Sequence, residues 1–404
     1  MRISTNQFYQ SGLNSILDQQ SGLNRTQQQI ATGQRVQKPS DDPIATISII
    51  NLEQEISLTN RYIANGDIGT SNLGVEETVL QSFTDILQRV RELILSGGNA
   101  TYGDNERNSL AVEMDELLSQ MVGLANQKSS AGDYMFSGNK INVEPFTKTA
   151  AGSYQYNGDQ GVRNIQISTS TRIAMNDSGY EIFQNMLNGN GDFVGAQNLS
   201  NTGTGVINEG SVVDNSAYIP DTYTIDLVDL GGGVLGYDVT GATSGAVITS
   251  ATFVEGGDIA FNGVSFNISG APAIGDSFSL TPSSRQDIFT TVQNALAALT
   301  TSVSTPAQNA QMNNALQRAL IDLDQGMEHI GTIHAEVGTR LNVLDSQKLI
   351  NIDFIINSRI TLSSVRDLDM AEAITDLNLR KIGLEAAQAS FVRIQNLSLF
   401  NFLR

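Results

Sequence analysis

Both ends of the chain carry apolar residues at alternating steps of three and four positions, a spacing that places side chains along one stripe of a helix. The N-terminal stripe contains Leu13, Ile16, Gln20, Leu23, Gln27 and Ile30. The C-terminal stripe contains Met370, Ala373, Leu377, Arg380, Leu384, Ala387, Phe391 and Ile394. Because a helix with a single apolar stripe gains little stability alone in water, each end is expected to pair with the other or with neighbouring subunits. The predicted assembly seam is Leu13, Ile16, Leu23, Ile30, Leu377, Leu384, Phe391 and Ile394.

Proline placement predicts two further helical blocks. An interior proline costs a helix about 3 kcal/mol, and none of the seven prolines lies between residues 44 and 144 or between 307 and 404. In the first block, apolar residues at helical spacing run over 79–93 and 110–124, with a turn predicted at 96–99. In the second block the same spacing persists from Leu316 to Leu344. Both patterns favour long helices packed lengthwise.

The middle of the chain has a different pattern. Residues 145–284 contain 21 of the 37 glycines and four of the seven prolines, and their apolar residues alternate with a period near two. Asn262-Gly263 separates two such alternating runs and accepts the positive φ angles of a tight hairpin turn. A second hairpin is predicted around Asn157-Gly158-Asp159. This region is therefore expected to be an inserted, mainly antiparallel β domain.

Together these patterns predict an α+β protein. Its N- and C-terminal segments form a long antiparallel helical rod that carries the β insertion. The expected segments are an N-terminal assembly helix that pairs with the C-terminus (1–40), the first half of the rod (41–146), the β-rich outer domain (147–284), the second half of the rod (285–369) and a C-terminal assembly helix (370–404).

Composition excludes several classes of function. The formal net charge of −19 argues against nucleic-acid binding, because phosphates require a basic surface. No apolar run approaches the length of a membrane span, and the first residues lack the pattern of a cleavable secretory signal. Cysteine is absent, which removes disulfides and thiolate chemistry from consideration.

No constellation of residues points to catalysis, and no cofactor or metal is expected. The two histidines, His329 and His334, are five positions apart on a predicted helix, whereas helical metal ligands usually lie four apart. The run from Asn188 to Asp192 lacks the sixth-position glycine and the distant glutamate of a calcium-binding loop. No Ser-His-Asp set or phosphate-binding loop can be assembled. A structural, polymer-forming role is the best remaining interpretation.

The segment from Ile30 to Pro43 reads Ile-Ala-Thr-Gly-Gln-Arg-Val-Gln-Lys-Pro-Ser-Asp-Asp-Pro, with Ser40 or Asp41 expected to cap the following helix. It resembles the signature of the flagellin superfamily at Gly33, Arg35, Asp41, Asp42 and Pro43. The run from Asp367 to Leu377 resembles the matching C-terminal motif. The resemblance covers residues 1–146 and 285–404 and leaves the β insertion without a family motif.

Within this superfamily, the start Met1-Arg-Ile-Ser-Thr5 and the segment Tyr134-Met-Phe-Ser-Gly-Asn139 resemble the hook–filament junction branch more than filament flagellin. That resemblance implies a non-enzymatic subunit that is exported unfolded by the flagellar type III apparatus, without a cleaved signal, and resides in the extracellular flagellum. It implies contacts with other copies of the chain, with the first hook-associated protein, with flagellin and with an export chaperone. Nucleic acid and membrane are not expected partners. The alternatives are a filament-forming flagellin and an exported enzyme carried by the β insertion.

Overall fold

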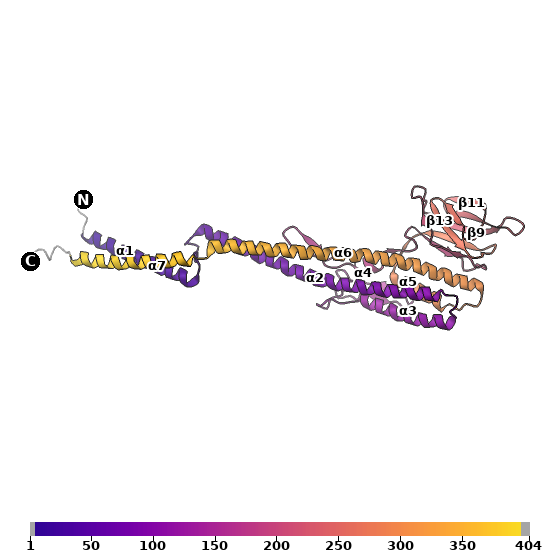
Figure 1. Cartoon of the computed structure of the whole chain (residues 1–404), viewed down its shortest axis with the longest axis horizontal. Helices are drawn as coiled ribbons and strands as arrows, with labels where there is room; N and C mark the ends of the chain where they lie inside the picture. The colour runs from indigo at the N-terminus through magenta and orange to yellow at the C-terminus, as the bar shows by residue number, and fades with distance from the viewer. Residues whose placement is uncertain (1–4, 397–404) are drawn as a thin grey trace, which may run out of the picture. The chain divides into compact units, whose positions relative to one another are not determined.

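The computed structural model describes residues 5–396, in which long helices precede and follow a region of antiparallel strands along the chain (Figure 1). The helices are α1 (Thr5–Thr32), α2 (Pro43–Gly97), α3 (Asp104–Ala125), α4 (Gly179–Phe183), α5 (Ile288–Thr300), α6 (Pro306–Arg366) and α7 (Met370–Asn396). The strands are β1 (Phe146–Lys148), β2 (Tyr154–Tyr156), β3 (Asn164–Gln166), β4 (Arg172–Ala174), β5 (Met186–Leu187), β6 (Phe193–Gln197), β7 (Val206–Ile207), β8 (Ser211–Val212), β9 (Tyr223–Asp229), β10 (Leu235–Gly241), β11 (Gly245–Thr252), β12 (Asp258–Phe261), β13 (Val264–Ser269), β14 (Ser277–Pro282) and β15 (Arg285–Gln286). The predicted α+β class is confirmed.

The chain forms two compact units. The terminal unit comprises residues 1–64 and 346–404, and the central unit comprises residues 65–345. Helices α2 and α6 each contribute residues to both units. The finer division into five segments stays a prediction. Among residues 5–396, no helix combines the length and apolar content needed to span a bilayer.

The two longest helices both begin with proline. α2 is 55 residues long and starts at Pro43, and α6 is 61 residues long and starts at Pro306. Proline suits this position because its fixed φ is helical and its missing N–H would have no partner in the first turn. The predicted turn near residues 96–99 is confirmed, since α2 ends at Gly97 and α3 begins at Asp104.

The first helical block ends earlier than its lack of proline indicates. α3 stops at Ala125, and the following residues form turns. At this end, the Asn126 side chain accepts a hydrogen bond from the Phe146 N–H at 2.9 Å and donates one to the Phe146 carbonyl at 2.8 Å. The residue that follows α3 is thereby tied to strand β1.

An aromatic cluster forms the core of the helical part of the central unit. Phe83, Phe136, Phe146, Phe183 and Phe289 are all fully buried. Their rings meet in edge-to-face or tilted arrangements, with Phe83 and Phe183 centroids 4.8 Å apart and Phe136 and Phe183 centroids 5.5 Å apart. Such pairs contribute about 0.5–1.5 kcal/mol beyond the area they bury. The cluster joins helices α2, α4 and α5 to strand β1.

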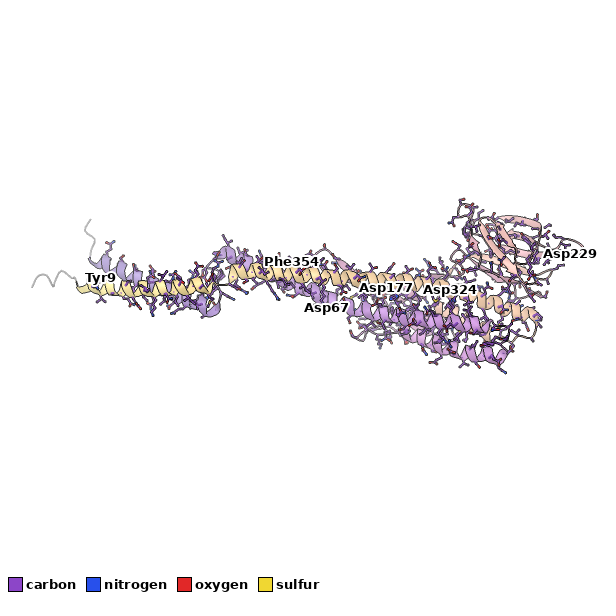
Figure 2. All side chains as sticks on the ribbon, in the orientation of Figure 1. Tyr9, Asp67, Asp177, Asp229, Asp324 and Phe354 are labelled. Carbon is purple, nitrogen blue, oxygen red and sulfur yellow. The ribbon has the colours of Figure 1, made fainter. Side chains whose placement is uncertain are left out.

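A charged cluster lies in the same unit. Glu76 of α2 is fully buried, and its Oε1 accepts a hydrogen bond from the Asp177 N–H at 3.3 Å, while its Oε2 has no partner. Asp177 forms an ion pair with Arg340 of α6. A second ion pair links Arg91 of α2 to Asp324 of α6 at 2.8 Å. Figure 2 labels both aspartates. Burial raises the pKa of Glu76 to about 8, and the nearby Asp177 carboxylate acts in the same direction.

The β region contains one five-stranded sheet, in the order β11-β10-β9-β14-β6, and a second sheet in the order β12-β13-β7. A separate hydrophobic core lies between their buried faces and includes Tyr223, Phe266 and Phe278. The predicted hairpin at Asn262-Gly263 is confirmed: Phe261 pairs with Val264, and both turn residues have positive φ angles of 42° and 79°.

The second predicted hairpin is wrong. β2 pairs with β1, the strand before it in the chain, and not with a strand that follows residues 157–159. Residues 157–159 therefore form a loop and not a hairpin turn. The polar side chains of this loop are used elsewhere. Asn157 donates to Thr147 Oγ1 at 2.9 Å, and the Asp159 carboxylate accepts from the Asn139 and Gly161 N–H groups, each at 2.8 Å. Asn157 and Asp159 therefore indicate that the chain leaves the strand here, but they do not specify a hairpin turn.

Polar side chains of α6 attach the β region to the helices. Asn314 Oδ1 accepts a hydrogen bond from the Ile207 N–H at 3.0 Å, and its Nδ2 donates to Gln197 at 2.7 Å. Asp322 Oδ1 accepts from the Gly189 N–H at 2.6 Å. Asn314 and Asp322 are buried, so breaking these bonds would leave polar groups without partners.

The buried face of α2 gives a direct test of the core. Leu87 is fully buried, whereas Leu95 on the same helix is 52% exposed. We expect Leu87→Ala to lower the free energy of unfolding by about 2–5 kcal/mol, because it removes buried methyl groups and leaves a cavity. The matched Leu95→Ala should cost less than about 1 kcal/mol. Urea denaturation of both variants measures this, and equal losses would refute the assigned face.

Glu76 gives a prediction on pH. In the unfolded chain the Glu76 carboxyl group loses its proton near pH 4.5, whereas in the folded chain it keeps the proton up to about pH 8. Between these two pH values the folded chain therefore binds one proton more than the unfolded chain. The free energy of unfolding should therefore fall as pH rises through this window. Glu76→Gln should flatten that slope and be more stable than the native chain at pH 8. Urea titrations at pH 5–8 test this with Glu77→Gln, an exposed neighbour, as control; parallel slopes for all three proteins would contradict it.

Candidate assembly site

The terminal helices α1 and α7 pack together within the terminal unit (Figure 1). Tyr9 of α1, labelled in Figure 2, meets Phe391 of α7 edge to face with ring centroids 5.8 Å apart. Gly12 lies beneath the same ring, and a Cβ added there would lie 3.0 Å from its Cδ2 atom. The absence of a side chain at Gly12 therefore lets the Phe391 ring approach α1.

A polar contact continues the α1–α7 interface. Thr26 is buried, and its Oγ1 donates a hydrogen bond to Asp376 Oδ2 at 3.2 Å. Arg380 binds the same carboxylate oxygen through Nε at 2.6 Å and occupies the space above Gly22. The hydrogen bond from Arg380 lowers the pKa of Asp376. This interface thus relies on small and polar residues as much as on apolar ones.

The predicted seam is only partly covered by this packing. On α1, Ile16, Leu23 and Ile30 are half-buried, but Leu13 is 49% exposed. On α7, Leu377, Leu384 and Phe391 are half-buried, and the Ile394 side chain lies outside the described residues. The role of these residues in assembly stays a prediction.

Sequence reasoning missed the residues that α1 presents to α7. Gly12, Gln19, Gly22 and Thr26 repeat at steps of seven, three and four, but none of them is apolar. Gly383 of α7 lies opposite Gln19, which extends this set. A search for small residues at helical spacing, which mark closely approaching helices, could have found them. A search for apolar residues could not.

A short backbone pairing joins the segment after α1 to the segment before α7. Gly33 ends α1 with a φ of +69°, in the left-handed region that glycine adopts without strain. Its carbonyl accepts a hydrogen bond from the Leu368 N–H at 2.9 Å, and the Arg35 N–H donates to the Arg366 carbonyl at 2.7 Å. Gln34 and Asp367 form the antiparallel bridge between these two bonds. We call residues 33–42 and 365–369 the joint.

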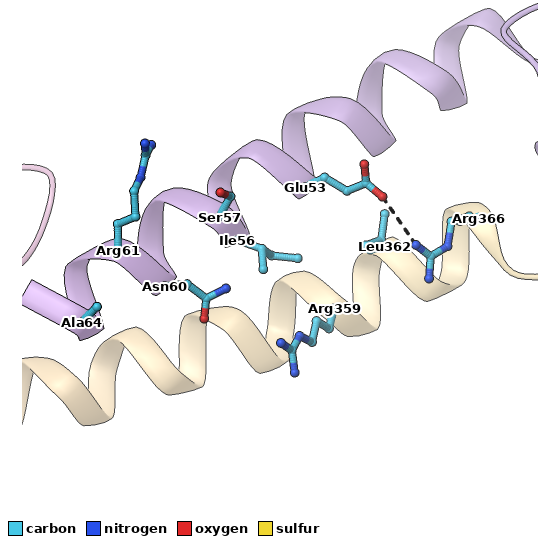
Figure 3. A pocket seen from close by; sticks show the side chains of 9 residues that line it. All are labelled: Glu53, Ile56, Ser57, Asn60, Arg61, Ala64, Arg359, Leu362 and Arg366. Atoms are coloured by element: carbon cyan, nitrogen blue, oxygen red, sulfur yellow. Dashed lines mark ion pairs between the residues drawn. The ribbon is translucent and has the colours of Figure 1, made fainter.

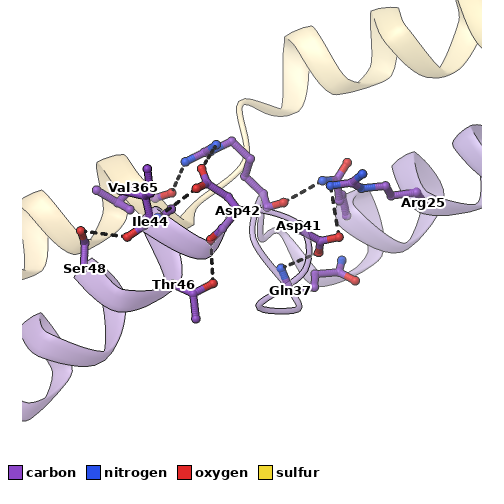
Figure 4. A network of polar contacts seen from close by, with 11 residues as sticks. Arg25, Gln37, Asp41, Asp42, Ile44, Thr46, Ser48 and Val365 are labelled. Carbon is purple, nitrogen blue, oxygen red and sulfur yellow. Dashed lines mark hydrogen bonds and ion pairs between the residues drawn. The ribbon is translucent and has the colours of Figure 1, made fainter.

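Arg35 and Asp42 hold the joint on the start of α2. Figure 4 labels Asp42 and Val365, the two residues that Arg35 binds. Arg35 donates through Nη2 to the Val365 carbonyl at 2.8 Å and through Nη1 to Asp42 Oδ2 at 3.4 Å. Asp42 also caps α2, because its Oδ1 accepts a hydrogen bond from the Ala45 N–H at 3.0 Å. That hydrogen bond is the main reason why the pKa of Asp42 is lowered.

The expected cap at Ser40 or Asp41 is therefore wrong. Pro43 occupies the first helical position, which makes the residue directly before it the cap. Asp41 instead folds the loop: its Oδ2 accepts from the Lys38 N–H at 3.0 Å, and its Oδ1 forms an ion pair with Arg25 of α1 at 3.1 Å. The hydrogen bond from Lys38 is the main cause of the lowered pKa of Asp41. Four of the five signature residues, Gly33, Arg35, Asp41 and Asp42, thus lie in the joint, and Pro43 follows them as the first residue of α2.

The terminal unit leaves many large apolar side chains exposed. These are Leu13 and Leu17 on α1, Ile44, Ile47 and Ile50 on α2, Leu349, Ile350, Ile352, Phe354, Ile356 and Ile360 on α6, and Met370, Ile374, Leu379, Ile382 and Val392 on α7. A surface this rich in exposed apolar residues is typical of an interaction site.

The two histidines and the carboxylates of the described residues do not form a metal-binding cluster. Among them, no group of three or more histidine, aspartate or glutamate side chains is arranged to hold a metal ion. His329 contacts the Glu181 carbonyl through Nε2 at 2.7 Å, and His334 is half-buried in α6. Both histidines therefore lie within the helical framework.

Comparison with known proteins identifies the family. The family described as the bacterial flagellin N-terminal helical region matches residues 3–141. Flagellar hook-associated protein 3 of Salmonella typhimurium is 24% identical over 409 residues that span the full length of both chains. A crystal structure of hook-associated protein 3 from Legionella pneumophila is 34% identical, with a TM-score of 0.77, over 78% of this chain and 98% of that one.

A crystal structure of Xanthomonas campestris FlgL is 30% identical, with a TM-score of 0.72, over 77% of this chain and 99% of that one. Sequence identity at this level over nearly the whole of the solved chains extends the likeness beyond the fold. The chain therefore belongs to the flagellar hook-associated protein 3 family, within the flagellin superfamily.

Proposed function

We propose that this chain is a structural adaptor that joins the hook-associated layer of the bacterial flagellum to the flagellin filament. Its family is a structural component of the flagellum and not an enzyme. The observation that carries the proposal is the terminal unit, whose helices are fixed by the joint while many large apolar side chains remain uncovered. A subunit of this kind gains most of its remaining burial from neighbouring subunits.

The terminal helices are the proposed assembly elements. Residues 1–40 and 370–404 form the inner zone of the assembled junction, with Leu13, Ile16, Leu23, Ile30, Leu377, Leu384, Phe391 and Ile394 as its coiled-coil seam. The α1–α7 contact supports this assignment, because its use of Gly12, Gly22 and Thr26 leaves Leu13 free for another subunit. Residues 41–146 and 285–369 then form the rod, and 147–284 the outer domain.

The joint has a defined part in this proposal. The signature residues Gly33, Arg35, Asp41, Asp42 and Pro43 fix the course of the chain between α1 and α2 and bind the backbone before α7. These bonds hold the paired terminal helices on the rest of the terminal unit before any neighbour is present. The joint thus reduces the conformational entropy that assembly must remove.

The proposed partners are other copies of the chain, the first hook-associated protein on the hook side, flagellin on the filament side and an export chaperone. The proposed location is the hook–filament junction outside the cell, reached through the flagellar type III apparatus without a cleaved signal. The missing cysteines favour such a route, because a chain that unfolds and refolds across compartments then has no thiols to oxidise.

The sequence leaves two alternative functions. A filament-forming flagellin remains the alternative within the same superfamily, and it differs from an adaptor in polymerising alone into long filaments. An enzyme carried by the β region is not favoured by any observation: the sequence there contains no histidine or cysteine, and the described residues contain no group of three or more carboxylates arranged to hold a metal ion.

Removing a terminal helix tests the adaptor function. A chain lacking residues 1–30 or 377–404 should stay soluble but fail to enter flagella, and cells should be non-motile, because the assembly helices act as a pair. The Leu199→Ser and Val213→Ser double variant, which changes exposed apolar residues of the β region, should be incorporated normally. Electron microscopy and motility assays measure both. Normal filaments from either truncation would refute the proposal.

The gene-deletion strain separates the adaptor from the flagellin alternative. It should keep its hooks and release flagellin monomers into the medium, because filament growth would lack its base. Purified full-length chain that polymerises alone into long filaments would favour flagellin instead.

The joint makes a local prediction that depends on its cap. Asp42→Ala should speed hydrogen exchange at the Ala45 amide by roughly 2- to 10-fold, because that N–H loses its acceptor. Ser40→Ala is the matched control and should leave the exchange rate unchanged, since no hydrogen bond of the Ser40 side chain is present among the described residues. A larger effect from Ser40→Ala would reverse the assignment of the cap.

A further inference from the structure

A groove runs between α2 and α6 inside the terminal unit (Figure 3). It has a volume of about 700 Å³, and its apolar lining is Ile56, Ala64 and Leu362. The residues from Glu53 to Ala64 span eleven steps of helix, which corresponds to about 16 Å. The groove is therefore long enough to contact one face of a third helix over about three turns.

The polar lining of the groove is basic. Arg61, Arg359 and Arg366 line it together with a single carboxylate, that of Glu53. Arg366 is held by Glu53 at 3.5 Å. Arg61 and Arg359 are exposed and form no hydrogen bond or ion pair with any other described residue. Two unpaired guanidinium groups thus lie beside an apolar surface.

One exposed isoleucine on each helix lies next to the groove. On α2, Ile50 precedes the groove residue Ser57 by seven positions and therefore lies on the same side of the helix. On α6, Ile356 precedes Arg359 by three positions and neighbours it on the helix surface. The groove is therefore suited to a helix that carries both an apolar residue and carboxylates on one face.

The two units of the chain differ in net charge. The terminal unit contains 12 lysine and arginine residues against 11 aspartate and glutamate residues, whereas the central unit contains 11 against 31. A basic groove on the terminal unit and an acidic central unit on a neighbouring copy attract each other. Two central units repel each other. This asymmetry favours a contact between unlike units of two copies.

Helix α3 has the required face. Val112 is 74% exposed, and Asp115 and Glu116 follow it at steps of three and four, on the same side of the helix. The other acidic residues of α3 are engaged within the chain: Asp104 binds Arg107, Glu106 accepts from the Gly103 N–H, and Glu113 binds Arg89. Asp115 and Glu116 are exposed, with no partner among the described residues.

We propose that the groove of one copy receives α3 of a neighbouring copy. Val112 packs on Ile56 and Leu362, while Asp115 and Glu116 pair with Arg61 and Arg359. The contact uses different surfaces on the two copies, so it propagates from subunit to subunit around a layer. Each exposed ion pair contributes little to the free energy of binding. The contact therefore needs the high local concentration of an assembled layer, and in this respect it rests on the proposed function.

Cross-linking in assembled flagella tests this contact, and the absence of native cysteine removes background reaction. Two differently tagged full-length copies are co-expressed, one carrying Ser57→Cys in the groove and the other Val112→Cys. A bismaleimide is applied to isolated flagella. We expect at least tenfold more mixed dimer than with Ser57→Cys and Val213→Cys, in which the second site is an exposed valine of the β region.

Charge reversal adds a second arm. Arg61→Glu with Arg359→Glu should lower the Ser57–Val112 cross-link at least tenfold, and adding Asp115→Arg with Glu116→Arg should restore it. Circular dichroism verifies the fold of each variant. If the chain enters flagella but gives no cross-link above the control, the proposed contact is wrong and the adaptor function is unaffected. The same conclusion follows if the chain cross-links to flagellin instead of a second copy. A chain absent from flagella overturns the adaptor function itself.

Discussion

Two packed helices can bury only one face of each, and this constraint governs the terminal unit. α1 pairs with α7 through Gly12, Gly22 and Thr26, and the joint binds the chain before α7 to the chain after α1. Neither arrangement provides a third layer, so isoleucine and leucine side chains stay exposed along all four helices of the unit. The central unit differs, because α3, α5 and the strands supply the missing layers around the aromatic cluster. The free chain is therefore well packed in one unit and incompletely covered in the other.

Electrostatics follow the same division. The acidic residues are concentrated in the well-packed central unit, while the terminal unit is close to neutral and presents unpaired arginines in its groove. Like charge keeps central units apart in solution, and the uncovered apolar surface attracts neighbours once they are aligned. This combination favours a chain that stays soluble as a monomer and packs closely only within an ordered array. It agrees with membership of a family of flagellar junction proteins.

Much of the fold could be predicted from periodicity. The long helices, the antiparallel middle region and the Asn262-Gly263 hairpin all have local sequence signals. The remainder depended on contacts between distant segments. The α1–α7 interface uses glycine and threonine, which carry no apolar signal, and the cap at Asp42 follows from the position of Pro43. Arg61 and Arg359 are about 300 positions apart, so only the structure could place them in one groove. Likewise, nothing in the sequence around Glu76 distinguishes a buried carboxylate from an exposed one.

The central claim is that neighbours cover the exposed apolar residues of the terminal unit in the assembled junction. Hydroxyl-radical footprinting of the free chain and of isolated flagella measures this coverage residue by residue. The account predicts that oxidation of Phe354, Ile360 and Leu379 falls by about tenfold on assembly, while that of Leu199 and Val213 in the β region changes little. Equal oxidation of Phe354, Ile360 and Leu379 in the free and assembled states would contradict it.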